Sequence, residues 1–150
     1  MPYTITQIED AILAALAPLK VSHGVRTLDS YDLRLEDPEA WKKLAIKFPA
    51  IFVLFGDLDD KDLGQRQMEM QRFQIGMAES SLRAGEARRG GLQVEGAYGL
   101  IQGVQDSLAG KILLPNLLPA MRKGVQRALI ADGVAMYVAT YTIGQGYLIP

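Results

Sequence analysis

The dipeptide Asp132-Gly133, set between two runs of alternating apolar residues, is the strongest constraint that this chain places on its fold. A two-residue hairpin turn needs positive φ at both central positions, and Asp-Gly meets that need. We therefore predict an antiparallel hairpin formed by residues 125–131 and 134–143. The second run is apolar on both faces, since Val134 and Tyr137 lie on opposite sides of it. Such a strand is expected inside a sheet or against another subunit.

Three further segments are predicted to be strands. Residues 50–55 have no polar face, which is typical of a central strand covered on both sides. Residues 67–78 alternate, but their apolar positions change phase near Gln71 and Arg72, and we expect a β-bulge there. Residues 21–28 alternate imperfectly and are predicted to form the first strand, followed by a polar loop over residues 29–36.

Three segments are predicted to be helices. Thr4 and Gln7 have the spacing of a capping box, and the helix that they begin should end near Pro18. Asp37 and Pro38 are typical of a second helix start. A third helix is expected from Leu92, with Gly110 as its left-handed C-cap. The apolar stripes comprise Ile5, Ile8, Ile12 and Leu16 in the first helix, Trp41, Leu44, Ala45 and Phe48 in the second, and Val94, Ala97, Tyr98, Ile101, Val104 and Leu108 in the third.

Together these segments predict one α+β domain over residues 1–150. We expect a mostly antiparallel sheet of about five strands, with the first and third helices on one face and the short Trp41 helix at the edge. A chain of 150 residues is long enough to bury a single core, and no Ser/Gly/Pro-rich linker divides it. Residues 112–119 form an apolar, proline-marked loop before the hairpin.

Composition narrows the classes of function. The formal net charge is −1, so nucleic acid would need a local basic patch rather than a global positive field. There is no cysteine, which excludes disulfides and thiolate sites. The longest apolar run, residues 11–17, is far shorter than the roughly 20 residues of a membrane helix, and the first residues lack a basic signal region. We expect a soluble intracellular product without a membrane partner.

Four aspartates form the most acidic segment of the chain. It is predicted to be a loop, and its carboxylates are Asp57, Asp59, Asp60 and Asp62. A calcium loop of the EF-hand type needs glycine at its sixth position and a bidentate acid at its twelfth. Counted from Asp57, those positions hold Asp62 and Met68, so the pattern fails. A solvated acidic hairpin loop, a docking surface for a basic partner and a divalent-cation site remain as alternatives.

Three arginines form the one notable basic cluster, in a glycine-rich connector. They are Arg83, Arg88 and Arg89, with Glu86 among them. The planar guanidinium group binds either carboxylate or phosphate through two hydrogen bonds. A solvated connector, a salt-bridged subunit contact and a phosphate contact with DNA are the alternatives, and Arg72 is a further candidate for the last of these.

No arrangement of residues predicts catalysis. His23 is the only histidine and lacks the context of a nucleophile elbow, while Glu95 and Asp106 are expected to face solvent on the third helix. The glycines near residues 90–103 do not follow a strand in a nucleotide-binding pattern, and close helix packing explains them better. We therefore predict no catalytic residue, no cofactor, no metal and no small-molecule substrate.

Four motifs occur in an order that resembles a known phage family. They are Ile-Glu-Asp-Ala-Ile-Leu at residues 8–13, Phe-Pro-Ala-Ile-Phe-Val at 48–53, Arg-Arg-Gly-Gly at 88–91 followed by Tyr-Gly-Leu-Ile at 98–101, and Gly-Val-Ala-Met-Tyr-Val at 133–138. The chain is similar to the Mu-like bacteriophage tail terminator family, often described only as a phage domain of unknown function. The resemblance extends from Ile5 to about Thr142, and its motifs shape the fold rather than a catalytic site.

The resemblance implies a virion protein that caps the tail tube and sheath of a contractile-tailed phage or prophage as a ring, commonly of six subunits. Its partners would be copies of itself, tube and sheath proteins, and neck proteins. By position and charge, the segment from Arg83 to Arg89 is expected at the subunit contact or lumen, and the acidic segment is expected to dock to the tube or neck. A neck adaptor and a DNA-binding module remain as alternatives.

Overall fold

The fold is built on a five-stranded sheet. The computed structural model describes residues 2–30, 46–64, 66–81, 85–91, 95–131 and 133–148. Its strands are β1 (Thr27–Ser30), β2 (Ala50–Asp62), β3 (Arg66–Ser80), β4 (Met121–Ala131) and β5 (Val134–Leu148), in the order β1-β2-β3-β5-β4. Only β1 and β2 are parallel, and every other neighbouring pair is antiparallel. The predicted fold class, α+β with a mostly antiparallel sheet of about five strands, is confirmed.

Two longer helices and two single turns complete the described elements. They are α1 (Ile5–Leu16), α2 (Leu19–Ser22), α4 (Glu86–Arg89) and α5 (Ala97–Leu108). The predicted capping box is present, because the Gln7 amide N–H donates to Thr4 Oγ1 at 3.1 Å and the Thr4 N–H donates to Gln7 Oε1 at 2.8 Å. None of the helices in the described ranges is long and apolar enough to span a membrane.

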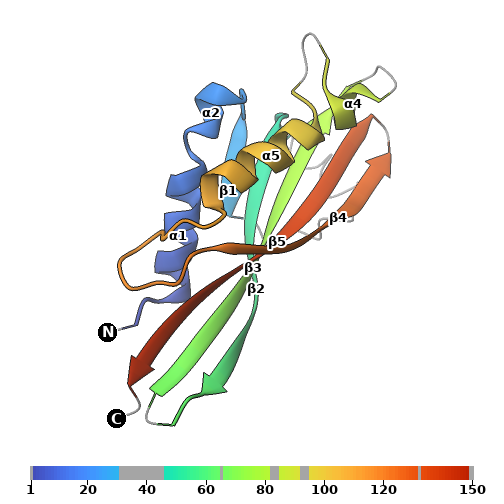
Figure 1. The fold of residues 1–150 in the computed structure, drawn as a ribbon. Coiled ribbons are helices and arrows are strands. Elements are labelled where there is room, and N and C mark those ends of the chain that lie inside the picture. The colour runs from blue at the N-terminus through green and yellow to red at the C-terminus, as the bar shows by residue number, and fades with distance from the viewer. Residues whose placement is uncertain are drawn as a thin grey trace.

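The main core lies between the sheet and the pair α1 and α5, which share one face of it (Figure 1). Fully buried side chains come from both helices and from the three central strands. They include Ile8, Ile12 and Leu16 of α1, Leu100, Val104 and Leu108 of α5, and Ile51, Val53, Phe73, Ile75, Met77 and Tyr141 of the sheet. Each large apolar side chain contributes roughly 1.5–3 kcal/mol when buried. The prediction of two main helices on one face is confirmed.

The hairpin predicted from Asp132-Gly133 is formed by β4 and β5. Ala131 pairs with Val134, and Gly133 has φ of 75°. β5 lies between β4 and β3. The strand with two apolar faces is therefore inside the sheet, which was one of the two positions predicted for it. The predicted central strand is also confirmed, since Ala50, Ile51, Phe52 and Val53 of β2 are all fully buried.

Beyond the ends of the helices, β2, β3 and β5 continue as a three-stranded extension (Figure 1). We call this extension the arm, and it comprises residues 56–62, 66–72 and 142–148. The predicted bulge lies at its root, but on a different strand from the one expected. Phe55 pairs with Phe73 and Asp57 with Arg72, so Gly56 of β2 is the extra residue. The pairing of β3 with β5 is continuous.

The change of phase in β3 therefore has another cause. Phe73, Ile75 and Met77 face α1 and α5, whereas Met68 and Met70 lie on the opposite face of the same regular strand. The apolar side of β3 switches where the helices end, and no residue is inserted.

The predicted first strand is wrong in its first half. Val21 belongs to α2, where its side chain is 90% exposed, and β1 begins only at Thr27. The His23 N–H donates to Leu19 O at 2.9 Å, and Gly24 with φ of 64° then turns the chain toward the sheet. The alternating pattern of residues 21–28 therefore did not indicate a buried strand face, because Val21 is exposed. Asp29 and Ser30, predicted as loop, belong to β1.

The second and third predicted helices differ in outcome. The helix expected around Asp37 and Trp41 falls on residues 31–45, outside the described residues, while Phe48 lies in a bend and not in a helix. The helix expected from Leu92 begins later, at Ala97, after Gly96 with φ of 82°. Its predicted end is confirmed, since Gly110 has φ of 73°. The loop expected over residues 112–119 is also present, with a single bridge from Leu117 to Gln145.

Candidate functional site

The turn α4 carries the basic cluster predicted from the sequence. Gly85 and Gly90 flank α4 with φ of 79° and 85°. On the inner side of the turn, Ala87 packs against Ala97, Ala135 and Tyr137. The outward side carries Arg88, which is half-buried, and Arg89, which is exposed. Arg83 lies outside the described residues. The structure thus brings Glu86, Arg88 and Arg89 onto one helical turn.

Glu86 has a structural part in this turn. Its carboxylate accepts a hydrogen bond from Ser81 Oγ at 3.1 Å, at the end of β3. It also lies over Gly91, where a Cβ atom would come within 2.5 Å of Glu86 Oε1. Glu86 therefore holds α4 against the sheet, while Arg89 on the same turn is exposed.

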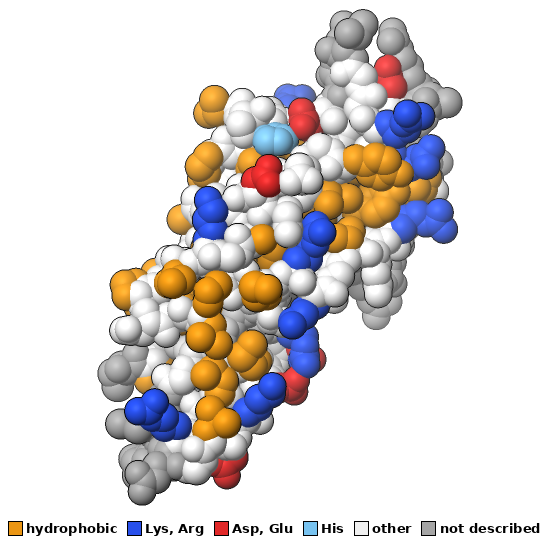
Figure 2. Space-filling model, in the orientation of Figure 1, with side chains coloured by type: hydrophobic (Ala, Val, Ile, Leu, Met, Phe, Trp, Pro, Cys, Tyr) orange, Lys and Arg blue, Asp and Glu red, His pale blue; other side chains and the backbone are white. Residues whose placement is uncertain are grey.

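Two tyrosines stand beside the arginines. The rings of Tyr98 on α5 and Tyr137 on β5 meet edge to face, with centroids 5.7 Å apart, and Tyr98 is 45% exposed. Burial, and then the hydrogen bond that the Tyr137 hydroxyl donates to Tyr98, raise the pKa of Tyr137, and the nearby charges of Arg88 and Arg127 act in the opposite direction. Arg127 pairs with Tyr137 across the strands, and Ala87 of α4 packs against the same tyrosine, so the α4 turn and Arg127 both lie beside Tyr137. Figure 2 shows an apolar area bordered by basic side chains on this part of the molecule.

The sequence did not indicate this Arg–Tyr surface, which comprises Arg88, Arg127, Tyr98 and Tyr137. Tyr98 was expected in the apolar stripe of its helix, and Arg127 received no role. Only the register that sets Arg127 opposite Tyr137 brings them together. Tyrosine and arginine are the residues enriched at the centres of protein interfaces. The surface therefore has the composition of a recognition surface.

A buried carboxylate supports this surface from below. Glu79 is 4% exposed, and burial raises its pKa, although hydrogen bonds from the backbone of Ser80, Gly96 and Glu95 act against that shift. The Ser80 N–H donates to Glu79 Oε1 at 2.9 Å. Glu79 thus ties the segment before α5 to the end of β3.

Replacing Glu79 by glutamine should change how stability depends on pH. The folded state holds the Glu79 proton to higher pH than the unfolded state, so this group favours folding below its ordinary value of 4.5 and loses that effect as pH rises through the raised pKa. We expect the Tm of Glu79→Gln, relative to the parent protein, to increase from acidic to neutral pH. Thermal unfolding followed by circular dichroism measures this, with the exposed Asp10→Asn as control. A Tm difference that shrinks with rising pH contradicts the assignment.

The four aspartates lie on a strand and not in the loop that was predicted. Pairing between β2 and β3 continues to Asp62 opposite Gln67, and the turn follows, closed by the Leu63 N–H donating to Arg66 O at 2.8 Å. The pairing partners on β3 hold the acidic segment extended, a constraint that composition alone does not reveal.

The arm separates these aspartates onto two faces. Asp57 and Asp59 share a face with Arg72, which donates to Asp57 Oδ1 at 2.8 Å and also to Asp59. These two carboxylates raise the pKa of Arg72. Asp60 and Asp62 lie on the other face, where Asp62 accepts from the Gly64 N–H at 2.9 Å and Asp60 has no described partner. Arg72, a candidate for DNA contact, is therefore already paired within the chain.

No cluster of three or more acidic or histidine side chains suited to a metal ion occurs in the described part of the chain.

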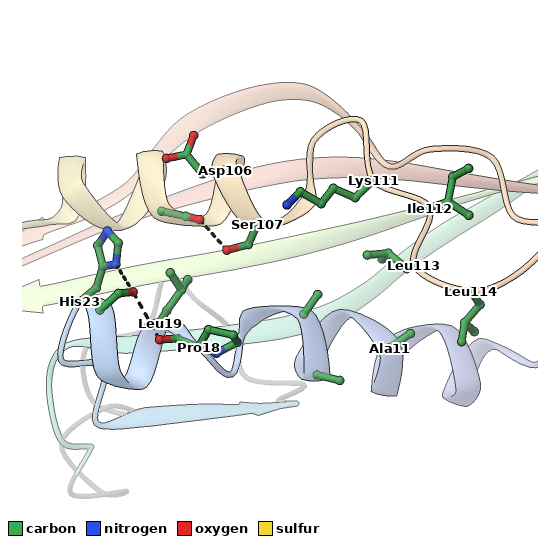
Figure 3. Close-up of a pocket in the computed structure, with 14 residues that line it drawn as sticks. Ala11, Pro18, Leu19, His23, Asp106, Ser107, Lys111, Ile112, Leu113 and Leu114 are labelled. Atoms are coloured by element: carbon green, nitrogen blue, oxygen red, sulfur yellow. Dashed lines mark hydrogen bonds between the residues drawn. The ribbon is translucent and has the colours of Figure 1, made fainter.

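A groove of about 740 Å³ runs between α1, α2 and the second half of α5 (Figure 3). Its walls are mainly apolar, and Lys111 lies along it toward Ser107 (Figure 3). At one end Ser22 Oγ lies 2.7 Å from His23 Nδ1, and His23 Nε2 lies 3.6 Å from Glu95 Oε1. The Ser22 hydroxyl also lies 3.3 Å from Pro18 O, the usual back-bond of a helical serine.

His23 and the helix glycines explain how the helices approach each other. A Cβ atom at Gly103 would lie 2.9 Å from His23 Nε2, so glycine at this position of α5 admits the imidazole ring. The prediction that close packing accounts for glycines on this helix is confirmed at Gly103. Of the acids predicted to face solvent, Asp106 is exposed, while Glu95 is partly buried and precedes the helix.

Comparison with known families gives a match over most of the chain. The family described as Bacteriophage Mu, Gp37 matches residues 4–143. No curated protein sequence matches the chain. The matched range is nearly the range over which the sequence resembles Mu-like phage proteins, and the resemblance is therefore confirmed.

Proposed function

Because the chain belongs to the bacteriophage Mu Gp37 family and is a phage structural protein, we propose that it is a tail terminator. In this proposal a ring of identical subunits, commonly six, stacks on the last layer of the tail tube and sheath of a contractile-tailed phage or prophage. The ring covers the growing end and stops polymerisation. The family match over almost the whole chain carries the proposal, and the small α+β fold agrees with it.

A closed ring of this kind needs two different surfaces on each subunit. In this proposal the α4 turn, with its basic side chains, supplies the charged part of one of them. We assign the segment with Arg83, Glu86, Arg88 and Arg89 to the subunit contact or the lumen. We assign the arm, with Asp57, Asp59, Asp60 and Asp62, to docking on the tube or neck.

In this proposal the chain acts by shape and makes or breaks no bond. The Ser22 and His23 pair is accounted for by helix packing and by the serine back-bond, which supports a role other than catalysis. The protein would assemble in the host cytoplasm and then reside in the virion tail.

The test is whether the purified protein recognises tails. We expect native mass spectrometry to show a closed oligomer, and we expect the protein to co-sediment with tail tubes but not with capsids. A tube preparation extended in its presence should give tails of limited length by electron microscopy. Binding to capsids alone would assign the protein to the neck as an adaptor, and tube growth unaffected by its presence would reject the terminator function.

A further inference from the structure

The edge strand β4 carries a row of positive charge that the proposed function does not use. Arg122, Lys123 and Arg127 are all exposed, and β4 is the last strand in the sheet order. Arg88 adds a fourth cation, since α4 packs against Tyr137 through Ala87 and Arg127 pairs with the same tyrosine. We call these four side chains the β4 cation row.

An irregularity of β4 aligns the row. Arg122 and Arg127 are an odd number of positions apart, so a regular strand would point them to opposite faces. The register shifts between Arg122 and Gly124, which leaves Lys123 as the extra residue. As a result Arg122 pairs with Tyr141 and Arg127 with Tyr137, and these two tyrosines lie on the same face of β5.

Among the residues that the structure describes, no member of the row has a carboxylate partner in an ion pair, and the carboxylate that acts together with Arg122 on Tyr141 is that of Asp106. Arg72 shows the contrast, because it forms ion pairs with Asp57 and Asp59, whereas no described carboxylate forms an ion pair with any member of the row. Figure 2 shows basic side chains following one another along this side of the molecule. In a chain of net charge −1, these cations are a local concentration of charge.

Another strand is a poor partner for this edge. A second register shift follows Arg127, and bulges together with exposed Arg and Lys are the features that prevent edge strands from pairing. Arginine instead suits phosphate, which its planar fork binds through two hydrogen bonds. From Arg122 to Arg127 the row spans roughly 17 Å at about 3.3 Å per residue, and duplex DNA carries one charge per ~1.7 Å of axis.

We propose that the β4 cation row binds the phosphate backbone of double-stranded DNA. Its place in a particle rests on the proposed function: a row that binds DNA would line the lumen of the ring, and Arg88 would then belong to the lumen rather than to the subunit contact. The binding itself is a property of the single chain. With a net charge of −1, DNA binding needs a local basic patch. In this proposal β4 supplies most of that patch, and the glycine-rich connector supplies less of it.

Fluorescence anisotropy with a labelled duplex, measured across a series of salt concentrations, tests the proposal. Each phosphate contact contributes about −0.9 to the slope of log K against log salt, so four contacts predict a slope of roughly −3.6 for one subunit. The double variant Arg122→Gln with Arg127→Gln should reduce the magnitude of that slope by about 2, and each substitution should weaken binding roughly tenfold near 0.1 M salt.

The matched control is Lys20→Gln with Arg26→Gln, which removes the same charge from α2 and from the chain before β1, the strand at the opposite edge of the sheet. This control should bind DNA as the parent does. Because Arg122 lies beside the buried Tyr141, the single variant Lys123→Gln provides a second test that leaves this contact intact.

Three results would overturn the proposal: no anisotropy change at low salt, an equal loss in the control, or equal binding of polyglutamate of the same charge. The last would make an acidic protein segment the partner. Ring formation is read separately by native mass spectrometry. A ring that ignores DNA would reject the row alone, and a DNA-binding chain that never caps tubes would reject the terminator function alone.

Discussion

The Gly96→Ala protein should lose about 3 kcal/mol or more of unfolding free energy, as the sum of backbone strain and overpacking. Gly96 has φ of 82° and ψ of 147°, a region that side chains other than glycine avoid. A Cβ atom there would lie 2.2 Å from the Gly90 backbone nitrogen and 2.6 Å from its Cα. Both contacts are with backbone, so a rotamer change cannot relieve them.

Gly24→Ala is the matched control for this substitution. Gly24 also has positive φ, 64°, but a Cβ atom at Gly24 would have nothing within 4 Å. Only the backbone term applies, and the expected loss is about 1 kcal/mol. Urea denaturation of the two variants and the parent measures the difference. Equal losses would mean that the contact between Gly90 and Gly96 does not hold α4 against α5, and that the Arg–Tyr surface is positioned by other contacts.

The features predicted well from the sequence are those encoded by neighbouring residues. The Thr4 and Gln7 capping box satisfies backbone groups within one turn, and the Asp132-Gly133 turn selects its own backbone angles. The buried segment of β2 is similarly local, because a run without polar residues can lie only where both faces are covered. These elements suffice for the α+β class and for the position of α1 and α5 on one face.

The features that were predicted poorly depend on which helix or strand lies opposite the residues concerned. Met68 and Met70 are apolar, yet they lie on the face of β3 that α1 and α5 do not cover, and the sequence cannot show where that cover ends. For the same reason the bulge was predicted in β3, but the extra residue is Gly56 of the neighbouring strand β2. Pairing register is a long-range property, and one strand does not contain it.

The candidate surfaces follow the same division. Charge clusters near α4 and in the arm were visible in the sequence, because they are runs of similar residues. The pairing of Arg72 with Asp57 and Asp59 was not visible, and neither was the alignment of Arg122 with Arg127, since each depends on the register of a neighbouring strand. Arg72 is thus not available to a partner, whereas the cations of β4 are.

The division of the arm into two faces leads to the final prediction. Asp57 and Asp59 are already paired with Arg72, whereas Asp60 and Asp62 are exposed on the other face, and Asp60 has no described partner. If the arm docks on a basic site of the tube or neck, the second face supplies the charge. The docking assignment, made for four aspartates, is therefore restricted to Asp60 and Asp62.

The double variant Asp60→Lys with Asp62→Lys should lose tube binding by about a hundredfold, because like charges brought together at an interface cost several kcal/mol. Native mass spectrometry should still show the parent oligomer, and co-sedimentation with tail tubes should show the loss. The control Asp10→Lys with Asp29→Lys makes the same charge change at exposed positions of α1 and β1 and should bind as the parent does. Tube binding that survives reversal at Asp60 and Asp62 would remove this face of the arm from the docking surface, because no attraction to a basic site could persist through that change.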